Sequence, residues 1–336
     1  MRDPATSPKD PNHLHAIALK PLWVGAGQQD LLDAVSAIHN LDEDTFLNFL
    51  IDQGLAPMWD QVLETYPDVD GVSDHFKSAL HQSRLLSAGT YLLHKHALGD
   101  IRRILDDADV AHVIMKGAHI RERFYADPDT RGACDVDVLV DEGQKESAIR
   151  AFMQSGIELY APASNISHEA SLVKGSLNID LHWHVLRPGR LKVPLTKQFL
   201  DNRQDYDSYW GMDDTATLFL ALIHPVFTKY ATTPQAALMR LVDLDVMLNS
   251  DKIQTDQLLD LLSRSGLKTA AWISLRWLSY LKGVCAASAL EEEIRPGKLR
   301  ERYLMHWLSR NLATRFVANP SLTQIGFTLE IGRAHV

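Results

Sequence analysis

The sequence predicts an α/β (α+β) protein in which a central mixed sheet is flanked, along the chain, by two helical regions. Three observations predict this class. Apolar residues recur at helical spacing over about 28–107, short apolar or alternating runs separated by Gly, Pro, Asp and Asn fill 110–185, and helical spacing returns after about residue 200. We therefore expect a flexible tail over 1–20, a helical region over 21–108, an α/β core over 109–200, a second helical region over 201–329 and a separate tail over 330–336.

Composition narrows the functional classes. The chain has 336 residues, of which 46% are hydrophobic and 23% charged, and its formal net charge is −9. This is the composition of a globular protein, so disorder and fibrous repeats are excluded. Because an acidic protein repels a phosphate backbone, we expect no bulk nucleic-acid binding, although a local basic pocket for one nucleotide is compatible with this charge.

Cysteine use and hydropathy indicate the compartment. Cys134 and Cys285 are too few for a disulfide framework or a four-cysteine zinc site. The first twenty residues contain no apolar run of the kind that a secretory signal needs. The most apolar stretch, 215–227, is interrupted by His224 and Pro225 and is too short to span a bilayer. We expect a cytoplasmic protein with no membrane partner.

The first helical region shows its period most clearly at Phe46, Phe49 and Leu50, which follow the potential helix cap Asp42. The same spacing recurs at Leu98, Ile101 and Leu105.

The middle of the chain changes period. Strands are expected at 113–115, 136–140, 171–174 and 177–183, and a helix at 142–155. Gly175 and Ser176 separate the last two strands, as a tight hairpin requires. After residue 200 strand signals disappear. We expect a helix that Asp213 or Asp214 caps and Pro225 stops, and further helices around 241–248, 258–262 and 272–281.

The last seven residues, 330–336, read EIGRAHV, which resembles the translation of a common sequencing adapter. We expect these residues to be a non-native tail that is not part of the fold.

The strongest local feature is the pair of carboxylates Asp135 and Asp137. Side chains of a strand alternate between its faces, so these two acids point the same way, roughly 7 Å apart, while Val136, Val138 and Val140 face the core. Unpaired they repel, and a divalent cation bound between them removes that repulsion. A solvated strand face is the alternative interpretation.

Asp180 adds a third carboxylate. Leu177, Ile179 and Leu181 alternate with polar residues, so the strand has an apolar face and a polar face that carries Asp180. Mg²⁺ prefers hard oxygen ligands and is usually held by one or two carboxylates together with substrate phosphates. The pattern is that of a phosphoryl-transfer site.

Lys116, Gly117 and Ala118 follow a predicted strand and open a helix. A helix N-terminus presents backbone N–H groups and a positive dipole to phosphate. Lys116 adds charge there, and Arg131 adds the planar fork that matches phosphate oxygens. The competing interpretation is that Gly117 only permits a tight turn.

Three histidines leave alternatives open. His182 and His184 share the polar face with Asp180, and His-x-His at strand spacing can ligate zinc in a hydrolase. The other interpretation is that His182 orients Asp180 or a phosphate while His184 faces solvent. His168, just before the hairpin, is a further candidate for the same pocket.

Two other polar features have structural interpretations. Arg240 and Asp243 are three residues apart on an apolar helix, where an internal ion pair is preferred over ligand contact. Cys134 alternates to the face opposite the acids, where we expect it to act as a small apolar residue.

The motifs that carry a resemblance are, in chain order, Val-Ile-Met-Lys-Gly-Ala at 113–118, Tyr125, Pro128, Arg131, Asp-Val-Asp at 135–137, Asn-Ile-Asp-Leu-His-Trp at 178–183, His224 and Arg-Leu-Val-Asp at 240–243. In this order they resemble the uncharacterised nucleotidyltransferase family of the DNA polymerase β-like superfamily, over most of the chain. The resemblance implies a nucleotidyltransferase-like sheet. Several family members are encoded beside natural-product or capsule biosynthesis genes, so an acceptor from such a pathway is implied.

The resemblance also implies roles for single residues. Gly117 matches the turn that holds a nucleoside triphosphate, Asp135 and Asp137 match the pair that binds Mg²⁺ or Mn²⁺, and Asp180 matches the third acid, which supports attack by an acceptor hydroxyl. Many superfamily members have Gly-Ser at the turn. Here Ala118 replaces the Ser, so the hydroxyl contact to phosphate is missing and Lys116 would have to compensate.

The implied reaction is in-line displacement at the α-phosphorus of a nucleotide, with pyrophosphate leaving and two cations neutralising charge on the attacking and leaving oxygens. Two other classes stay open. One is a non-catalytic nucleotide-binding or partner-binding protein, favoured by the missing turn hydroxyl and the acidic charge. The other is a metal-dependent phosphohydrolase that uses the Asp and His residues of the same face.

Overall fold

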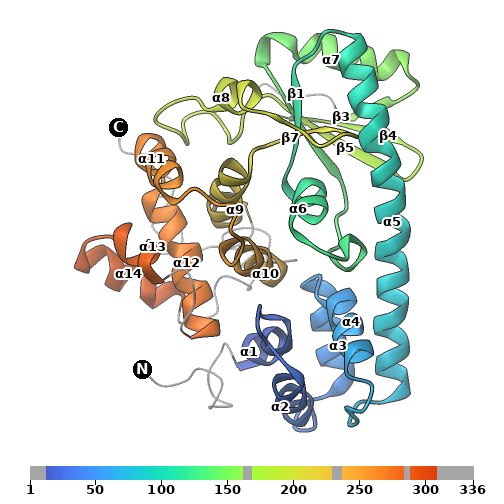
Figure 1. The fold of residues 1–336 in the computed structure, drawn as a ribbon, viewed down its shortest axis with the longest axis vertical. Helices are drawn as coiled ribbons and strands as arrows, with labels where there is room; N and C mark the ends of the chain where they lie inside the picture. The colour runs from blue at the N-terminus through green and yellow to red at the C-terminus, as the bar shows by residue number, and fades with distance from the viewer. Residues whose placement is uncertain (1–12, 162–168, 229–236, 284–287, 309–336) are drawn as a thin grey trace.

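A seven-stranded mixed sheet organises the fold and confirms the predicted α/β class (Figure 1). The structure is a computed structural model, and it describes residues 13–161, 169–228, 237–283 and 288–308. His168 and the tail at 330–336 lie outside these ranges, so the predictions made for them have no structural counterpart.

The described residues that precede the sheet, 13–107, are mainly helical, as predicted. Their elements are α1 (His13–Leu19), the 3-10 turn η2 (Lys20–Leu22), α2 (Gln28–Ile38), α3 (Glu43–Asp52), α4 (Ala56–Thr65) and α5 (Asp74–Asp107). Asp42 caps α3 by accepting a hydrogen bond from the Thr45 amide at 2.9 Å. The expected tail over 1–20 is wrong for α1, whose apolar residues from Ala16 to Leu19 are buried. They are too few for a periodic signal, and packing against other helices holds them in place.

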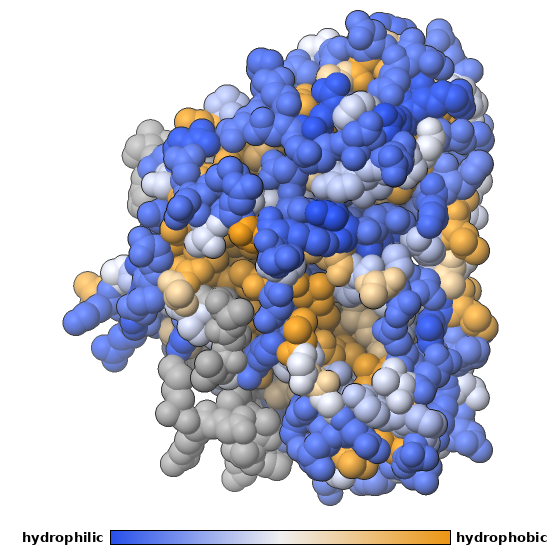
Figure 2. Space-filling model, in the orientation of Figure 1, coloured by the Kyte–Doolittle hydropathy of each residue, from blue (hydrophilic) through white to orange (hydrophobic). Residues whose placement is uncertain are grey.

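The long helix α5 connects the N-terminal helices to the sheet (Figure 1). Its two ends are packed, but Leu85, Leu86 and Leu92 in the middle are 60%, 68% and 65% exposed. Figure 2 shows the corresponding apolar strip along the right-hand edge of the molecule.

The strands are β1 (His112–Met115), β2 (Val136–Val140), β3 (Glu158–Ala161), β4 (Glu169–Lys174), β5 (Leu177–His182), β6 (Gln204–Asp205) and β7 (Trp210–Gly211). Their order is β3-β4-β5-β2-β1-β7-β6. β2 runs parallel to β5 and antiparallel to β1, and β1 runs parallel to β7. The hairpin predicted at Gly175 is confirmed: Lys174 pairs with Leu177, and Gly175 has a φ of +59°.

The connections in the sheet region are helical. They are α6 (Lys116–Phe124), the 3-10 turns η3 (Pro128–Thr130) and η4 (Glu142–Gln144), and α7 (Lys145–Gln154). The last two correspond to the helix expected over 142–155. The expected loss of strands after residue 200 is wrong, because β6 and β7 extend the sheet beyond β1. Two residues each are too short to show an alternating pattern.

The described residues from 196 to 308 are mainly helical. Their helices are α8 (Thr196–Asp201), α9 (Asp214–Thr228), α10 (Ala237–Leu248), α11 (Thr255–Ser265), α12 (Lys268–Lys282), α13 (Ser288–Glu293) and α14 (Lys298–Leu308). Asp213 caps α9 by accepting from the Ala216 amide at 2.8 Å. Pro225 was expected to stop this helix, but it lies inside it. Buried neighbours on both sides, Ile223 and Val226, hold the turn in place despite the missing amide.

Two hydrophobic clusters cover the two faces of the sheet. Val136, Val138 and Val140 of β2 pack with α5 and α7 on one face. Leu139 belongs to the other cluster, which extends through the N-terminal helices and through α9 to α12. Because strand side chains alternate, Asp137 lies on this second face. The helical regions therefore cover the face that carries the acids. No described helix has the length and apolarity needed to cross a bilayer.

Candidate active site

The candidate site forms where β2 and β5 run side by side. Asp137 is paired with Asp180 in the parallel register of these strands, so the two carboxylates leave the sheet on the same face. His182 follows Asp180 by two residues and also lies on this face. Ligand atoms of the three residues all lie within 4.8 Å of one another, so the group can hold a metal ion.

Asp137 is the centre of a buried polar cluster. Its side chain is 5% exposed, and its Oδ1 atom lies 2.5 Å from Lys116 Nζ and 2.8 Å from His182 Nε2. Burial alone would raise the pKa of Asp137, but Lys116 and His182 outweigh it and hold that pKa well below its usual range. Asp137 is therefore an anion at neutral pH, with an ammonium group where a metal ion would be expected.

His182 links Asp137 to a second carboxylate. Its Nε2 lies 3.1 Å from Lys116 Nζ, and its Nδ1 lies 3.3 Å from Glu169 Oε2. A single ring nitrogen either donates to Asp137 or accepts from Lys116. Alternation along β5 predicted that His182 faces the acids. It did not predict the contact with Asp137, because that depends on the register between β2 and β5.

Asp180 and Asp135 lie at the edges of this cluster. Asp180 is half-buried and accepts a hydrogen bond from Ser171 Oγ at 2.8 Å across the hairpin. Asp135 precedes β2, is half-buried, and is not one of the three residues in the metal-binding group. Burial, followed by the charge of Asp137, raises the pKa of Asp135 to about 6. The structure thus brings two of the three predicted acids together with His182 and leaves Asp135 beside them.

The turn between β1 and α6 has the expected form, a strand followed directly by a helix. Lys116 is the first residue of α6 and has a backbone φ of +55°, a value that residues other than glycine rarely adopt. Gly117 has a different constraint: a Cβ atom there would lie 2.8 Å from Arg131 Nη1 and 3.3 Å from Ala133 Cβ. Ala118 is fully buried in the first turn. Gly117 is thus needed for the close approach of a buried guanidinium.

Arg131 does not point its guanidinium toward the acids. It is 1% exposed and binds Asp243 of α10 through two hydrogen bonds, Nη2 to Oδ2 at 2.6 Å and Nε to Oδ1 at 3.0 Å. Tyr125 Oη also donates to Asp243, at 2.8 Å. The expected phosphate contact of Arg131 is therefore not supported by its geometry. The predicted ion pair between Arg240 and Asp243 is confirmed at 3.7 Å, although Arg131 is the nearer partner of Asp243.

A small pocket lies directly beside Lys116, between α6, α9 and α10. Its polar lining consists of Lys116, Thr217, His224, Arg240 and Asp243, and the remaining lining is Ile120, Leu220, Ala221 and Pro225. Two of the lining side chains, Lys116 and Arg240, are cationic, and Lys116 connects the pocket to the acids.

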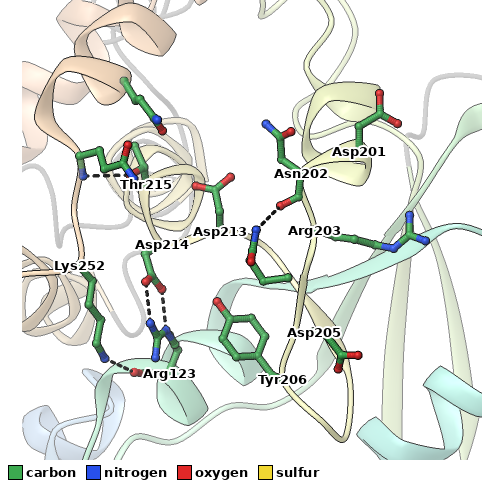
Figure 3. Close-up of a pocket in the computed structure, with 13 residues that line it drawn as sticks. Arg123, Asp201, Asn202, Arg203, Asp205, Tyr206, Asp213, Asp214, Thr215 and Lys252 are labelled. Atoms are coloured by element: carbon green, nitrogen blue, oxygen red, sulfur yellow. Dashed lines mark hydrogen bonds and ion pairs between the residues drawn. The ribbon is translucent and has the colours of Figure 1, made fainter.

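A larger, strongly polar hollow lies elsewhere, near the N-terminus of α9 (Figure 3). Arg123 donates two hydrogen bonds to Asp214, at 2.7 and 2.8 Å, and Lys252 donates to the Arg123 carbonyl at 3.0 Å. None of the predicted site residues lines this hollow, and its main charges satisfy one another. We assign it no chemistry.

A second acidic group lies between α4 and α5 and consists of Asp60, Glu64 and His81. Arg84 forms ion pairs with both acids, so a cation already occupies the group. It is a structural network that joins two helices.

Two further predictions concern residues near the strands. His184 contacts Glu142 at 3.6 Å rather than only solvent. Cys134 is exposed, so the expected packed position is wrong. It lies in the loop before β2, where strand alternation does not yet apply.

Comparison with known proteins adds one finding. A family model described as "Uncharacterised nucleotidyltransferase" matches residues 39–282, which include both strands of the site and the pocket beside them. Comparison with curated proteins gave no match.

Proposed function

The chain belongs to the uncharacterised nucleotidyltransferase family, and from this premise we propose that it transfers a nucleoside monophosphate from a nucleoside triphosphate to a hydroxyl-type acceptor in a metal-dependent reaction. The observation that carries the proposal is the pairing of Asp137 with Asp180 in adjacent parallel strands, with a Lys ammonium 2.5 Å from Asp137. This arrangement supports a cation-binding site with phosphate-binding groups beside it.

The donor set fits a divalent cation. Asp137 and Asp180 supply hard oxygen ligands of the kind that Mg²⁺ and Mn²⁺ take, and His182 adds a nitrogen that Mn²⁺ accepts. The ammonium of Lys116 already shows that this position favours positive charge. A bound cation would neutralise charge that develops on the attacking and leaving oxygens.

The other steps of the proposed reaction are assigned to side chains and backbone groups of the protein. The acceptor oxygen forms a bond to the α-phosphorus, the bond from that phosphorus to the β-phosphate oxygen breaks, and pyrophosphate leaves with its electron pair. Asp180 is the proposed acceptor of the hydroxyl proton, because it is half-buried and, among the described residues, only the Ser171 side chain donates a hydrogen bond to it. Lys116 and the turn at Gly117 lie where the phosphates would meet the helix N-terminus.

The function is tested with Asp137→Asn and Asp180→Asn. Both keep the side-chain shape and remove the charge, so the fold is expected to persist. Each wild-type reaction contains one labelled nucleoside triphosphate, Mg²⁺ and an extract of candidate acceptors, including natural-product and capsule precursors. We expect labelled product and released pyrophosphate, and a loss of at least about 100-fold in the Asp137 variant, since metal stabilisation contributes several kcal/mol.

Asp260→Asn is the matched control, because Asp260 is an exposed partner of Arg264 on α11. It should match the wild type. Full transfer by Asp137→Asn would contradict the proposal.

A metal-dependent phosphohydrolase is the second candidate. The observation that favours it is His182 in the same three-residue group as the acids, because mixed nitrogen and oxygen ligands suit hydrolytic metal sites. Nucleotide loss with water as the only acceptor would support this candidate. Nucleotide binding without release of pyrophosphate would instead identify a non-catalytic binding protein.

A further inference from the structure

Lys116 occupies a position that it would have to leave during the proposed reaction. Its Nζ atom lies 2.5 Å from Asp137 Oδ1 and 3.1 Å from His182 Nε2, two of the atoms that a cation would bind. An ammonium and a divalent cation cannot share one carboxylate oxygen at contact distance without strong repulsion. Binding of a metal ion therefore displaces Lys116, whose flexible stem allows this movement.

Among the described residues, Arg240 has one carboxylate at ion-pair distance, that of Asp243, and this carboxylate is shared. Its Nη1 is 3.7 Å from Asp243 Oδ2, but Asp243 already accepts two hydrogen bonds from Arg131 and one from Tyr125. The Nε atom of Arg240 is buried and has no hydrogen-bond partner. The side chain as a whole is 20% exposed, so the cost falls on this one buried nitrogen, which lacks an acceptor.

The charged groups around Arg240 also favour a bound anion. Burial, followed by the charge of Arg131, lowers the pKa of Arg240. Burial also lowers the pKa of His224 well below its usual range, with Lys116 and Arg240 contributing. Two cationic groups and a neutral imidazole thus line one pocket, and its single acid, Asp243, is already paired.

On the basis of the proposed function, we propose that the polyphosphate of the nucleotide binds to Lys116 and Arg240, two of the residues that line this pocket between α6, α9 and α10. The pocket itself, about 20 Å³ in volume, is too small for the whole polyphosphate, so only part of it enters. Arg240 binds it with its planar fork, and Lys116 moves from Asp137 to the phosphate oxygens when a metal ion takes its place. Lys116 thus pairs with Asp137 until nucleotide and metal arrive, and then binds the phosphates directly.

The first test measures Mn²⁺ binding without nucleotide, from the loss of the free-ion signal in electron paramagnetic resonance. Lys116→Met removes the competing charge and keeps most of the stem, so Mn²⁺ affinity should rise roughly tenfold or more above the wild type. The double variant Lys116→Met/Asp137→Asn should lose this gain, which places the ion at Asp137. Lys197→Met, which removes an exposed lysine of α8, is the matched control and should bind Mn²⁺ like the wild type.

The second test measures binding of inorganic pyrophosphate by calorimetry, with chelator present and metal absent. Arg240→Gln should weaken binding about 10-fold to 100-fold, the effect of losing charge-assisted hydrogen bonds. Arg240→Lys keeps the charge without the fork and should give an intermediate affinity, so it also serves if the Gln variant does not fold. Arg264→Gln, on the surface of α11, should bind like the wild type.

Unchanged Mn²⁺ affinity in Lys116→Met, or unchanged pyrophosphate affinity in both Arg240 variants, would overturn the proposal. Its failure is distinguishable from failure of the proposed function. If the protein binds pyrophosphate through Arg240 but releases none from any nucleotide, the phosphate subsite is supported and the transferase activity is contradicted. If the Arg240→Gln variant transfers nucleotide as well as the wild type, the transferase activity is supported and the phosphate subsite is contradicted.

Discussion

Lys116 and Gly117 meet two different backbone demands at adjacent positions. Lys116 adopts a left-handed φ of +55°, a conformation that costs a non-glycine residue of order 1–3 kcal/mol and tends to occur at functional sites. Gly117 has no positive φ, but it leaves room for the guanidinium of Arg131. The turn therefore uses glycine for space and accepts strain at the lysine, which places an ammonium over Asp137.

This difference predicts the effect of Gly117→Ala. The new Cβ would lie 2.8 Å from Arg131 Nη1. The Arg131 side chain, which is buried and held by two hydrogen bonds to Asp243, would therefore have to move. We expect a loss of about 1–3 kcal/mol in the free energy of unfolding, as for other overpacked sites. Chemical denaturation measures it.

Gly132→Ala is the matched control, because the nearest atom to its new Cβ would be Ser87 Oγ at 3.7 Å, an ordinary contact. Its stability should stay close to that of the wild type. Equal losses in the two variants would show that the approach of Arg131 is not the constraint.

Single-residue patterns predicted part of the site. Strand alternation was enough to place Asp137 and Asp180 on polar faces, since each lies in a strand with a regular apolar period. The contacts of Lys116 with Asp137 and of Arg131 with Asp243 were missed, because they join residues 21 and 112 positions apart. Such pairs depend on the packing of whole elements, which local spacing does not encode.

At the scale of elements, the period of the sequence predicted the strands of the central sheet and most helices. It missed the edge made by β6 and β7, each two residues long. Side chains of α6 hold this edge in place. His119 Nδ1 lies 3.0 Å from Tyr209 Oη, and a Cβ atom at Gly211 would lie 2.7 Å from the His119 ring.

His119 makes this edge sensitive to pH. Burial lowers the pKa of His119 to about 4, whereas an unfolded histidine has a pKa of about 6.5. Between these values the unfolded chain binds more protons, so the stability from the neutral ring is present above about pH 6.5 and is lost as the pH falls toward 4. From pH 7 to pH 5 we expect the contribution of His119 to fall by about 2 kcal/mol.

His119→Gln removes this titration. The unfolding free energy of the variant, measured by denaturation at both pH values, should fall less between pH 7 and pH 5 than that of the wild type. The other buried histidines titrate in both proteins, so their contribution cancels when the two changes in unfolding free energy with pH are compared. Parallel losses in the two proteins would mean that His119 does not carry the effect.

At the scale of the whole molecule, the helical regions and the sheet form one packed unit. One hydrophobic cluster includes residues of α1 to α5, of β1 and β2, and of α9 to α12. Polar contacts join the N-terminal helical region to the C-terminal one directly: Lys282 and the Val24 amide both bind Asp245. Composition shifts marked the regions along the sequence, but they carried no information on how these regions share a core.

The ion pair of Arg131 with Asp243 connects the loop before β2 to α10, and thus the sheet region to the C-terminal helices. Both side chains are 1% exposed, so removing one partner leaves the other charge buried without compensation. We expect Arg131→Met to lower the free energy of unfolding by about 3–5 kcal/mol.

Asp243→Asn keeps an acceptor for Tyr125 and removes the buried charge. The double variant Arg131→Met/Asp243→Asn should therefore be destabilised by less than the sum of the two single variants, with a coupling of about 1–3 kcal/mol. Because this pair joins regions that share one core, each variant should still unfold in a single transition, with fluorescence and circular dichroism giving the same midpoint. Additive losses, or midpoints that separate in the Arg131 variant, would show that the pair does not couple the sheet to the C-terminal helices.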